Sequence, residues 1–211
     1  MGDATDMTTE IKPISDTSLP LGTDRLILRK FRPGDYESYA AYHSRPDVYR
    51  FLYCDPPTDG LMKQNFERVV EPRFEEDGDV FHLAVEQRVG GAVIGETLFK
   101  LASKRALQLE VGYIFNPTFG GKGYATEAVA ATVGFGFEEL GAHRIFARLD
   151  ALNSGSVGVV ERLGFRREAH LIQNDRFNGT WGDEFVYAML KSEWERQRER
   201  TGLLRAADAN R

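Results

Sequence analysis

The chain has 211 residues, 42% of them hydrophobic, which is enough for one ordinary domain with a sizeable core. Its formal net charge of −5 argues against a nucleic-acid partner, because nucleic-acid binders usually carry a basic face. No apolar run approaches the roughly 18 residues of a membrane span, and residues 1–22 lack the apolar core of a signal peptide. The single cysteine, Cys54, allows no internal disulfide and favours a reducing, cytoplasmic compartment.

The chain divides into three parts by composition. Residues 1–20 are rich in Asp, Thr, Ser and Pro, and they predict a flexible N-terminal arm. Residues 21–195 predict a single domain, and residues 196–211 a charged tail.

The first half of the domain predicts one strand and three helical segments. A strand is expected at 26–31, and Pro33-Gly34-Asp35 opens a helix. A short helical patch at 47–52 and a helix at about 61–75 follow.

The second half predicts mostly strands. Val89-Gly90-Gly91 joins strands at 80–86 and 92–99 as a hairpin, and the strand at 107–115 alternates apolar and polar residues. The remaining expected elements are a helix at 126–140, a strand at 144–149, a helix at 154–163, strands at 165–172 and 184–190, and a charged helix or tail at 191–200. Hairpins followed by alternating strands and helices predict an α+β fold, with a mixed, mostly antiparallel central sheet flanked by helices.

A glycine-rich turn stands between an apolar strand and a helix. It contains Gly120, Gly121, Lys122 and Gly123. Unpaired N–H groups and the dipole at a helix N-terminus can bind phosphate or pyrophosphate. No GK[ST] ends the turn and no GxGxxG follows the first strand, so neither a P-loop nor a dinucleotide fold is indicated. The turn alone leaves ATP, NAD and CoA open.

A second polar pair, Asn153 and Ser156, opens the helix at 154–163. Read structurally, Asn153 is an N-cap and Ser156 bonds within the first turn. Read functionally, the amide binds an amide-rich ligand and the hydroxyl hydrogen-bonds a leaving group. The two interpretations are compatible.

These residues resemble the GNAT N-acetyltransferase superfamily, and most closely its RimJ/RimL-like branch. Four blocks carry the resemblance: residues 23–29, 110–117, 121–128 and 153–165. One departure is Gly120, where the superfamily usually has Gln or Arg, or an aromatic residue in this branch. A glycine there predicts a more flexible turn.

The resemblance implies a GNAT-like acyl-CoA N-acyltransferase fold, acetyl-CoA as the cofactor and a primary amine as the acceptor. It implies that backbone amides of the turn bind the pyrophosphate, that two strand residues pair with the pantetheine arm, and that Asn153 orients that arm. The cofactor-binding residues are thus Ile114, Phe115, Gly121, Lys122, Gly123, Tyr124, Ala125, Thr126, Asn153 and Ser156.

Amine attack on a thioester requires a neutral amine, an oxyanion donor and a proton or hydrogen bond for the thiolate. By resemblance and position, Ser156 is the candidate for the thiolate. Glu110 is the candidate base, directly or through water, with a solvated or salt-bridged carboxylate as the alternative.

The resemblance leaves several functional questions open. The acceptor is a protein N-terminus or a small-molecule amine, set by segment 36–73 and by a loop expected at 174–182, and a homodimer is a family-level expectation. A non-catalytic CoA-binding or regulatory module and a nucleotide-binding protein are the competing functions. The histidines and Cys54 show no metal-ligand spacing, so no metal is expected.

Overall fold

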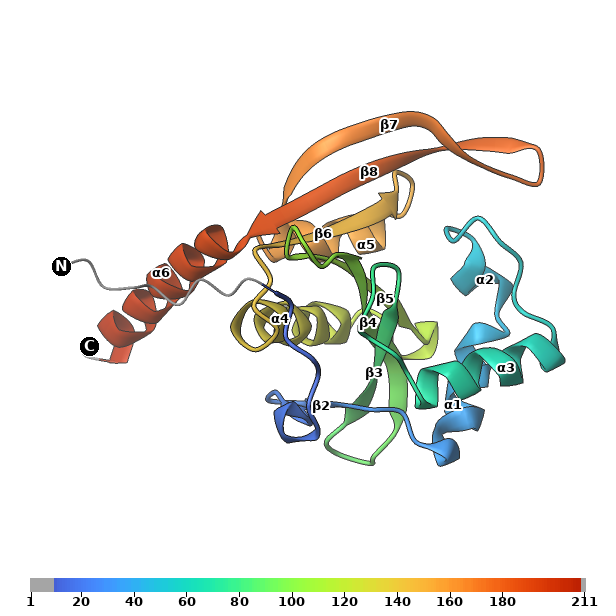
Figure 1. The fold of residues 1–211 in the computed structure, drawn as a ribbon, viewed down its shortest axis with the longest axis horizontal. Coiled ribbons are helices and arrows are strands. Elements are labelled where there is room, and N and C mark those ends of the chain that lie inside the picture. Colours follow the sequence, from blue (N-terminus) through green and yellow to red (C-terminus); the bar gives the residue numbers. More distant parts are fainter. Residues whose placement is uncertain (1–9, 210–211) are drawn as a thin grey trace.

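The computed structural model describes residues 10–209, and within them eight strands form one sheet in the order β1-β2-β3-β4-β5-β6-β8-β7 (Figure 1). Every neighbouring pair is antiparallel except β5 and β6, which are parallel. The strands are β1 Leu21–Gly22, β2 Leu26–Arg29, β3 Val80–Gln87, β4 Val93–Ser103, β5 Gln108–Phe115, β6 Arg144–Asp150, β7 Arg166–Phe177 and β8 Thr180–Leu190. The expected α+β class with a mixed, mostly antiparallel sheet is confirmed.

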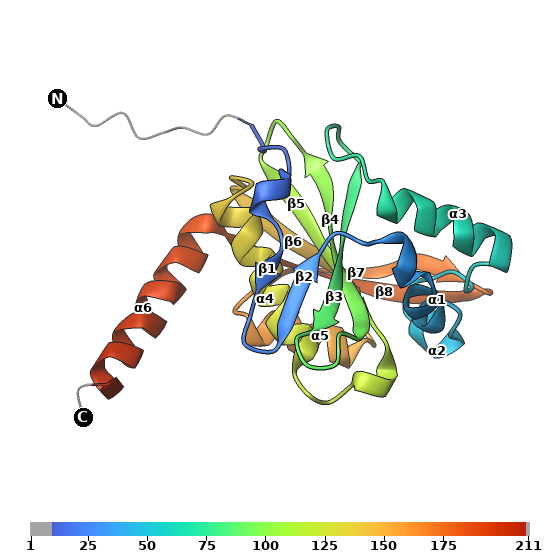
Figure 2. The same ribbon diagram turned by 90° about the horizontal axis from the view of Figure 1, so that it is seen from below.

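Helices cover both faces of this sheet (Figures 1 and 2). Helices α1 (Tyr36–His43), α2 (Pro46–Tyr49) and α3 (Asp59–Val70) lie on one side. Helix α4 (Tyr124–Glu138) packs on the other side, next to α5 (Ser154–Arg162). Helix α6 (Lys191–Ala209) follows β8 and projects from the body of the domain in both views.

Strand β5 separates two hydrophobic clusters. Leu109 and Val111 are buried with the α4 side of the core, whereas Ile114 packs against the cluster formed by α1 and α3. The strand's alternating sequence thus serves both faces of the sheet.

The parallel pairing of β5 with β6 is short. It consists of Gln108 with Arg144, Leu109 with Ile145, and Glu110 with Phe146. Beyond Glu110 the two strands separate, while β5 keeps pairing with β4 through Phe115. The second half of β5 therefore has an edge without a neighbouring strand on its β6 side.

Several sequence predictions for the elements were wrong in their bounds. Helix α3 ends at Val70 instead of 75, because Pro72 cannot continue a helix and disfavours helical geometry in the residue before it. Strands β7 and β8 run on to Phe177 and Thr180, into the segment 174–182 that was expected to be a loop. Asn178 and Gly179, with φ of 48° and 81°, form the tight turn between them.

The N-terminal segment contacts the domain where the structure describes it. Ile11 is buried, and the Lys12 N–H donates to the carbonyl oxygen of Leu140 at 2.9 Å. Residues 1–9 of the expected arm lie outside the described part of the chain.

Candidate functional site

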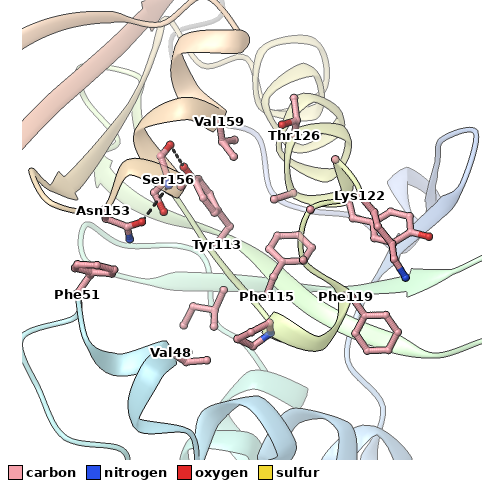
Figure 3. Close-up of a pocket in the computed structure, with 18 of the residues that line it drawn as sticks. Val48, Phe51, Tyr113, Phe115, Phe119, Lys122, Thr126, Asn153, Ser156 and Val159 are labelled. Atoms are coloured by element: carbon pink, nitrogen blue, oxygen red, sulfur yellow. Dashed lines mark hydrogen bonds between the residues drawn. The ribbon is translucent and has the colours of Figure 1, made fainter.

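A cleft of about 650 Å³ opens where β5 and β6 separate (Figure 3). Its walls come from α2 and the residues after it, the second half of β5, the glycine turn, the start of α4 and the start of α5. The lining residues are Asp47, Val48, Phe51, Leu52, Tyr113, Ile114, Phe115, Pro117, Phe119, Gly120, Gly121, Lys122, Gly123, Tyr124, Ala125, Thr126, Asn153, Gly155, Ser156, Val159 and Arg162. All ten residues expected to bind the cofactor are among them.

The glycine turn adopts a backbone that requires glycine at two positions. Gly121 and Gly123 have φ of 74° and 77°, in the left-handed region that side chains disfavour. Gly123 is the N-cap of α4 and provides no side-chain cap. The N–H groups of the first turn therefore face the cleft mouth without a capping side chain, which suits an anion.

Gly120, where the sequence departs from the resemblance, has an ordinary φ of −62°. A Cβ there would lie 3.0 Å from the carbonyl oxygen of Pro117, closer than most such contacts. This crowding favours glycine at a position where the backbone angle alone does not.

Asn153 and Ser156 lie on the opposite wall of the cleft, at the start of α5 (Figure 3). Asn153 Oδ1 accepts the Ser156 N–H at 3.1 Å, so the expected capping role is present. The Ser156 carbonyl oxygen accepts the hydroxyl of Tyr113 at 2.9 Å. Among the described residues none bonds to Ser156 Oγ, which leaves this hydroxyl available to a ligand.

Glu110 does not line the cleft. It lies where β5 and β6 part, and it alternates with Leu109 and Val111, which are buried on the α4 side. Its side chain therefore belongs to the face of the sheet that carries α1 and α3, separated by the sheet from the core beneath α4.

Several charged residues that the sequence analysis did not single out share this sheet region with Glu110. Arg148 donates from Nε and Nη2 to the two carboxylate oxygens of Glu184, at 2.8 and 2.9 Å. This hydrogen bonding raises the pKa of Arg148, and the nearby charge of Glu110 adds to the shift. The hydroxyl of Tyr53, from the segment after α2, donates to Asp150. The residues Glu110, Arg148, Asp150 and Glu184 are called the charged face below.

A buried carboxylate was also missed. Glu96 on β4 is fully buried and accepts the Tyr42 hydroxyl at 2.8 Å. His82 Nδ1 lies 3.2 Å from its Oε1, and His43 Nε2 lies 3.4 Å from its Oε2. Burial alone would raise the pKa of Glu96, but the two histidines outweigh it and bring the pKa below its usual value. Residues so far apart in sequence give no local motif, so no pattern could have grouped them.

The family model described as "Acetyltransferase (GNAT) domain" matches residues 25–166 of the chain, which include strands β2 to β6, the cleft and both of its walls. The chain belongs to the GNAT acetyltransferase family. The expected family and fold are thereby confirmed, and the homologues indicate an N-acetyltransferase enzyme.

Individual GNAT relatives match over most of their length. An uncharacterized N-acetyltransferase, YnaD of Bacillus subtilis (strain 168), is 29% identical over 82% of this chain and 97% of its own. A GNAT-family acetyltransferase from Bacillus anthracis superposes with a TM-score of 0.74 at 28% identity, over 83% of this chain and 100% of that chain. Spermidine N-acetyltransferase from Vibrio cholerae, solved with CoA and spermine, has the same fold at 21% identity, with a TM-score of 0.70 over 82% and 99% of the two chains.

The described residues of this GNAT chain contain neither a membrane-spanning helix nor a metal-binding cluster. No helix within 10–209 is both long and apolar enough to cross a bilayer. Within the same range, no group of three or more His, Cys, Asp or Glu side chains has the arrangement of a metal site.

Proposed function

We propose that this chain transfers the acetyl group of acetyl-CoA to a primary amine, within a complex that holds both reactants. The observation that carries the proposal is the continuous cleft from the free edge of β5 to the uncapped N-terminus of α4. A strand edge suits an extended amide-containing arm, and a helix N-terminus suits a diphosphate, so the two ends of the cleft fit the two chemistries of CoA.

The residues present fit this cofactor. A Cβ built at Gly121 meets no atom within 4 Å, so the turn is open to a ligand. The backbone of Gly121, Lys122, Gly123, Tyr124, Ala125 and Thr126 would hold the diphosphate, and Ile114 and Phe115 the pantetheine arm. Bound acetyl-CoA supplies an activated acetyl carbonyl.

The chain's own groups then have three tasks. A backbone N–H from the free edge of β5 would donate to the acetyl oxygen as negative charge develops there. Ser156 Oγ, on the cleft wall, would donate to the departing thiolate sulfur as the C–S bond breaks. The new C–N bond releases a proton from the amine, and Glu110 would accept it directly or through water.

The charged face favours a cationic acceptor. It holds three carboxylates, Glu110, Asp150 and Glu184, against the single guanidinium of Arg148. Net negative potential attracts an alkylammonium ion to the side of the sheet where Glu110 lies. A protein N-terminus and a small-molecule amine both satisfy this requirement. The RimJ/RimL-like branch, the cytoplasmic location and a homodimer stay predictions.

The test is a free-thiol assay of the full chain with acetyl-CoA and an acceptor panel of N-terminal peptides, polyamines, amino sugars and amino acids. We expect thiol release that depends on one acceptor class, together with a thermal shift from acetyl-CoA that ATP and NAD do not produce. A thermal shift with acetyl-CoA but no acceptor-dependent thiol release would favour the non-catalytic CoA-binding module. If no CoA species shifts the melting temperature, both the enzyme and the CoA-binding module are refuted.

A further inference from the structure

The residues just before β2 bond directly to the glycine turn and to the start of α4. Arg25 Nη1 donates to the carbonyl oxygen of Lys122 at 2.9 Å, and Arg25 Nε donates to Glu127 Oε2 at 2.6 Å. The guanidinium carbon of Arg25 lies 4.7 Å from the centre of the Tyr124 ring. One side chain therefore contacts the turn, the first residue of α4 and a carboxylate in the first turns of α4.

Glu127 is held by further donors from the same segment. Its Oε1 accepts the Thr23 hydroxyl at 2.6 Å and the Arg25 backbone N–H at 2.9 Å. Burial on its own would raise the pKa of Glu127, but the bonds from Thr23 and Arg25 outweigh it and lower the pKa. The carboxylate is therefore ionised at neutral pH.

This carboxylate stands beside the proposed anion site. A negative charge at a helix N-terminus is favourable on its own, but it repels a second anion bound to the same N–H groups. Arg25 is well placed to cancel it. Its side chain is 47% exposed against 18% for Glu127, and its Nη2 would lie 3.6 Å from a Cβ built at Gly123.

Arg25 also fixes the direction of a peptide group. The C=O and N–H of a trans peptide point in opposite directions. Because the Lys122 carbonyl is bonded to Arg25, the Gly123 N–H of the same peptide points away from Arg25. The bond thus restrains the turn at a residue that lines the cleft.

We propose that Arg25 is a positioning residue for CoA, which neutralises Glu127 beside the diphosphate site and holds the Lys122–Gly123 peptide in its binding orientation. The inference rests on the proposed function, in which this turn binds CoA. The proposal gives Thr23 and Arg25 a role in cofactor binding. In the sequence these two residues were only part of the opening strand's pattern, which did not indicate that role.

The experiment compares wild type, Arg25→Ala, Arg25→Lys and the double variant Arg25→Ala/Glu127→Gln in the full chain. Calorimetric titration gives the Kd for CoA, and initial rates are measured with acetyl-CoA and with S-acetylpantetheine, a thioester without phosphate groups. Arg105→Ala, in the exposed turn between β4 and β5, is the matched control.

We expect Arg25→Ala to weaken CoA binding about five- to thirtyfold, the size of one charge interaction at a helix terminus. Its rate with S-acetylpantetheine should equal that of wild type, because this donor has no diphosphate to be repelled. The double variant should regain most of the lost affinity, since the uncompensated carboxylate is gone. Arg25→Lys should lie between wild type and Arg25→Ala, and Arg105→Ala should match wild type.

Three results would overturn the proposal: unchanged CoA affinity in Arg25→Ala, an equal loss with both donors, or an equal loss in the single and double variants. If Arg25→Ala does not fold by circular dichroism, the double variant decides the matter, and a loss of CoA affinity of fivefold or more in the double variant contradicts the proposal. If the wild-type protein binds CoA but transfers no acetyl group, only the proposed function is refuted. The calorimetric titrations would still measure the effect of Arg25 on the Kd for CoA.

Discussion

The hydroxyl of Tyr113 donates a hydrogen bond to the carbonyl oxygen of Ser156 across the gap between β5 and α5, at 2.9 Å. Burial raises the pKa of Tyr113, so the hydroxyl keeps its proton and donates throughout the neutral range. This bond joins the free half of β5 to the helix that carries the candidate proton donor.

Replacing Tyr113 by Phe should therefore destabilise the protein by about 1 kcal/mol, the usual value of one hydrogen bond, and lower the Tm by about 2–4 °C. Tyr36→Phe is the matched control, because its hydroxyl bonds to none of the described residues. Thermal melts followed by circular dichroism give both values. Equal Tm values for the two variants would show that the bond contributes nothing.

Ser156→Ala tests the proposed proton donor. We expect kcat to fall about tenfold to a hundredfold, at the lower end of general-acid effects, with the KM for acetyl-CoA nearly unchanged. Ser154→Ala, at an exposed position two residues earlier in α5, should retain wild-type kcat. If Ser156→Ala raised KM and left kcat alone, the hydroxyl would serve binding and not the chemistry.

Glu110→Gln tests the proposed base. We expect a lower rate at neutral pH that approaches wild type as the pH rises toward the pKa of the acceptor amine, because the amine then loses its proton without help. The measurement is a pH–rate profile for wild type, Glu110→Gln and the exposed control Glu37→Gln. A constant ratio of rates across that range would assign Glu110 a role other than proton transfer.

Glu96→Gln tests the buried carboxylate. We expect a loss of about 2–3 kcal/mol in the free energy of unfolding at pH 7, because Glu96 is fully buried and bonded as an anion. The folded-state pKa is lowered, so the stabilisation is present above the ordinary value of 4.5 and is lost as the pH falls toward the folded-state value. Urea titrations from pH 7 down to pH 3 should therefore show the difference shrinking below about pH 4.5, whereas a difference that grows there would contradict the assigned direction.

Gly123→Ala tests the backbone of the turn. With φ of 77°, alanine should cost about 1–2 kcal/mol and weaken CoA binding by displacing the N–H groups at the start of α4. Gly34→Ala, where an added Cβ meets no atom within 4 Å and φ is ordinary, should change neither property. Urea unfolding and calorimetry measure the two effects, and equal results for the two variants would remove the special role of Gly123.

Local sequence signals predicted the elements that surround the cleft. Gly121 and Gly123 adopt left-handed backbone angles at its wall, and the strand expected from its alternating residues is β5, whose second half lines the cleft. The hairpin at Gly90-Gly91 was likewise predicted, whereas Asn178-Gly179 carried the same kind of signal and was overlooked in favour of a loop.

The residues proposed to face the acceptor could not be predicted in this way. Glu110 and Arg148 come together because two strands part at that point, and Tyr53 reaches Asp150 from 97 positions away in the sequence. His43, His82 and Glu96 meet only through the packing of α1 on β3 and β4. Such long-range contacts depend on strand order, which no single segment encodes.

The parting of β5 and β6 has a consequence for how this protein can change over evolutionary time. On one side of this gap the proposed cofactor site is made of main-chain N–H groups, which most side-chain replacements leave in place. On the other side, the proposed recognition of the acceptor depends on the side chains of Glu110, Arg148 and Glu184, the last two of which bond to each other. With this division, a few replacements on the charged face would exchange one acceptor for another and leave the proposed cofactor site unchanged.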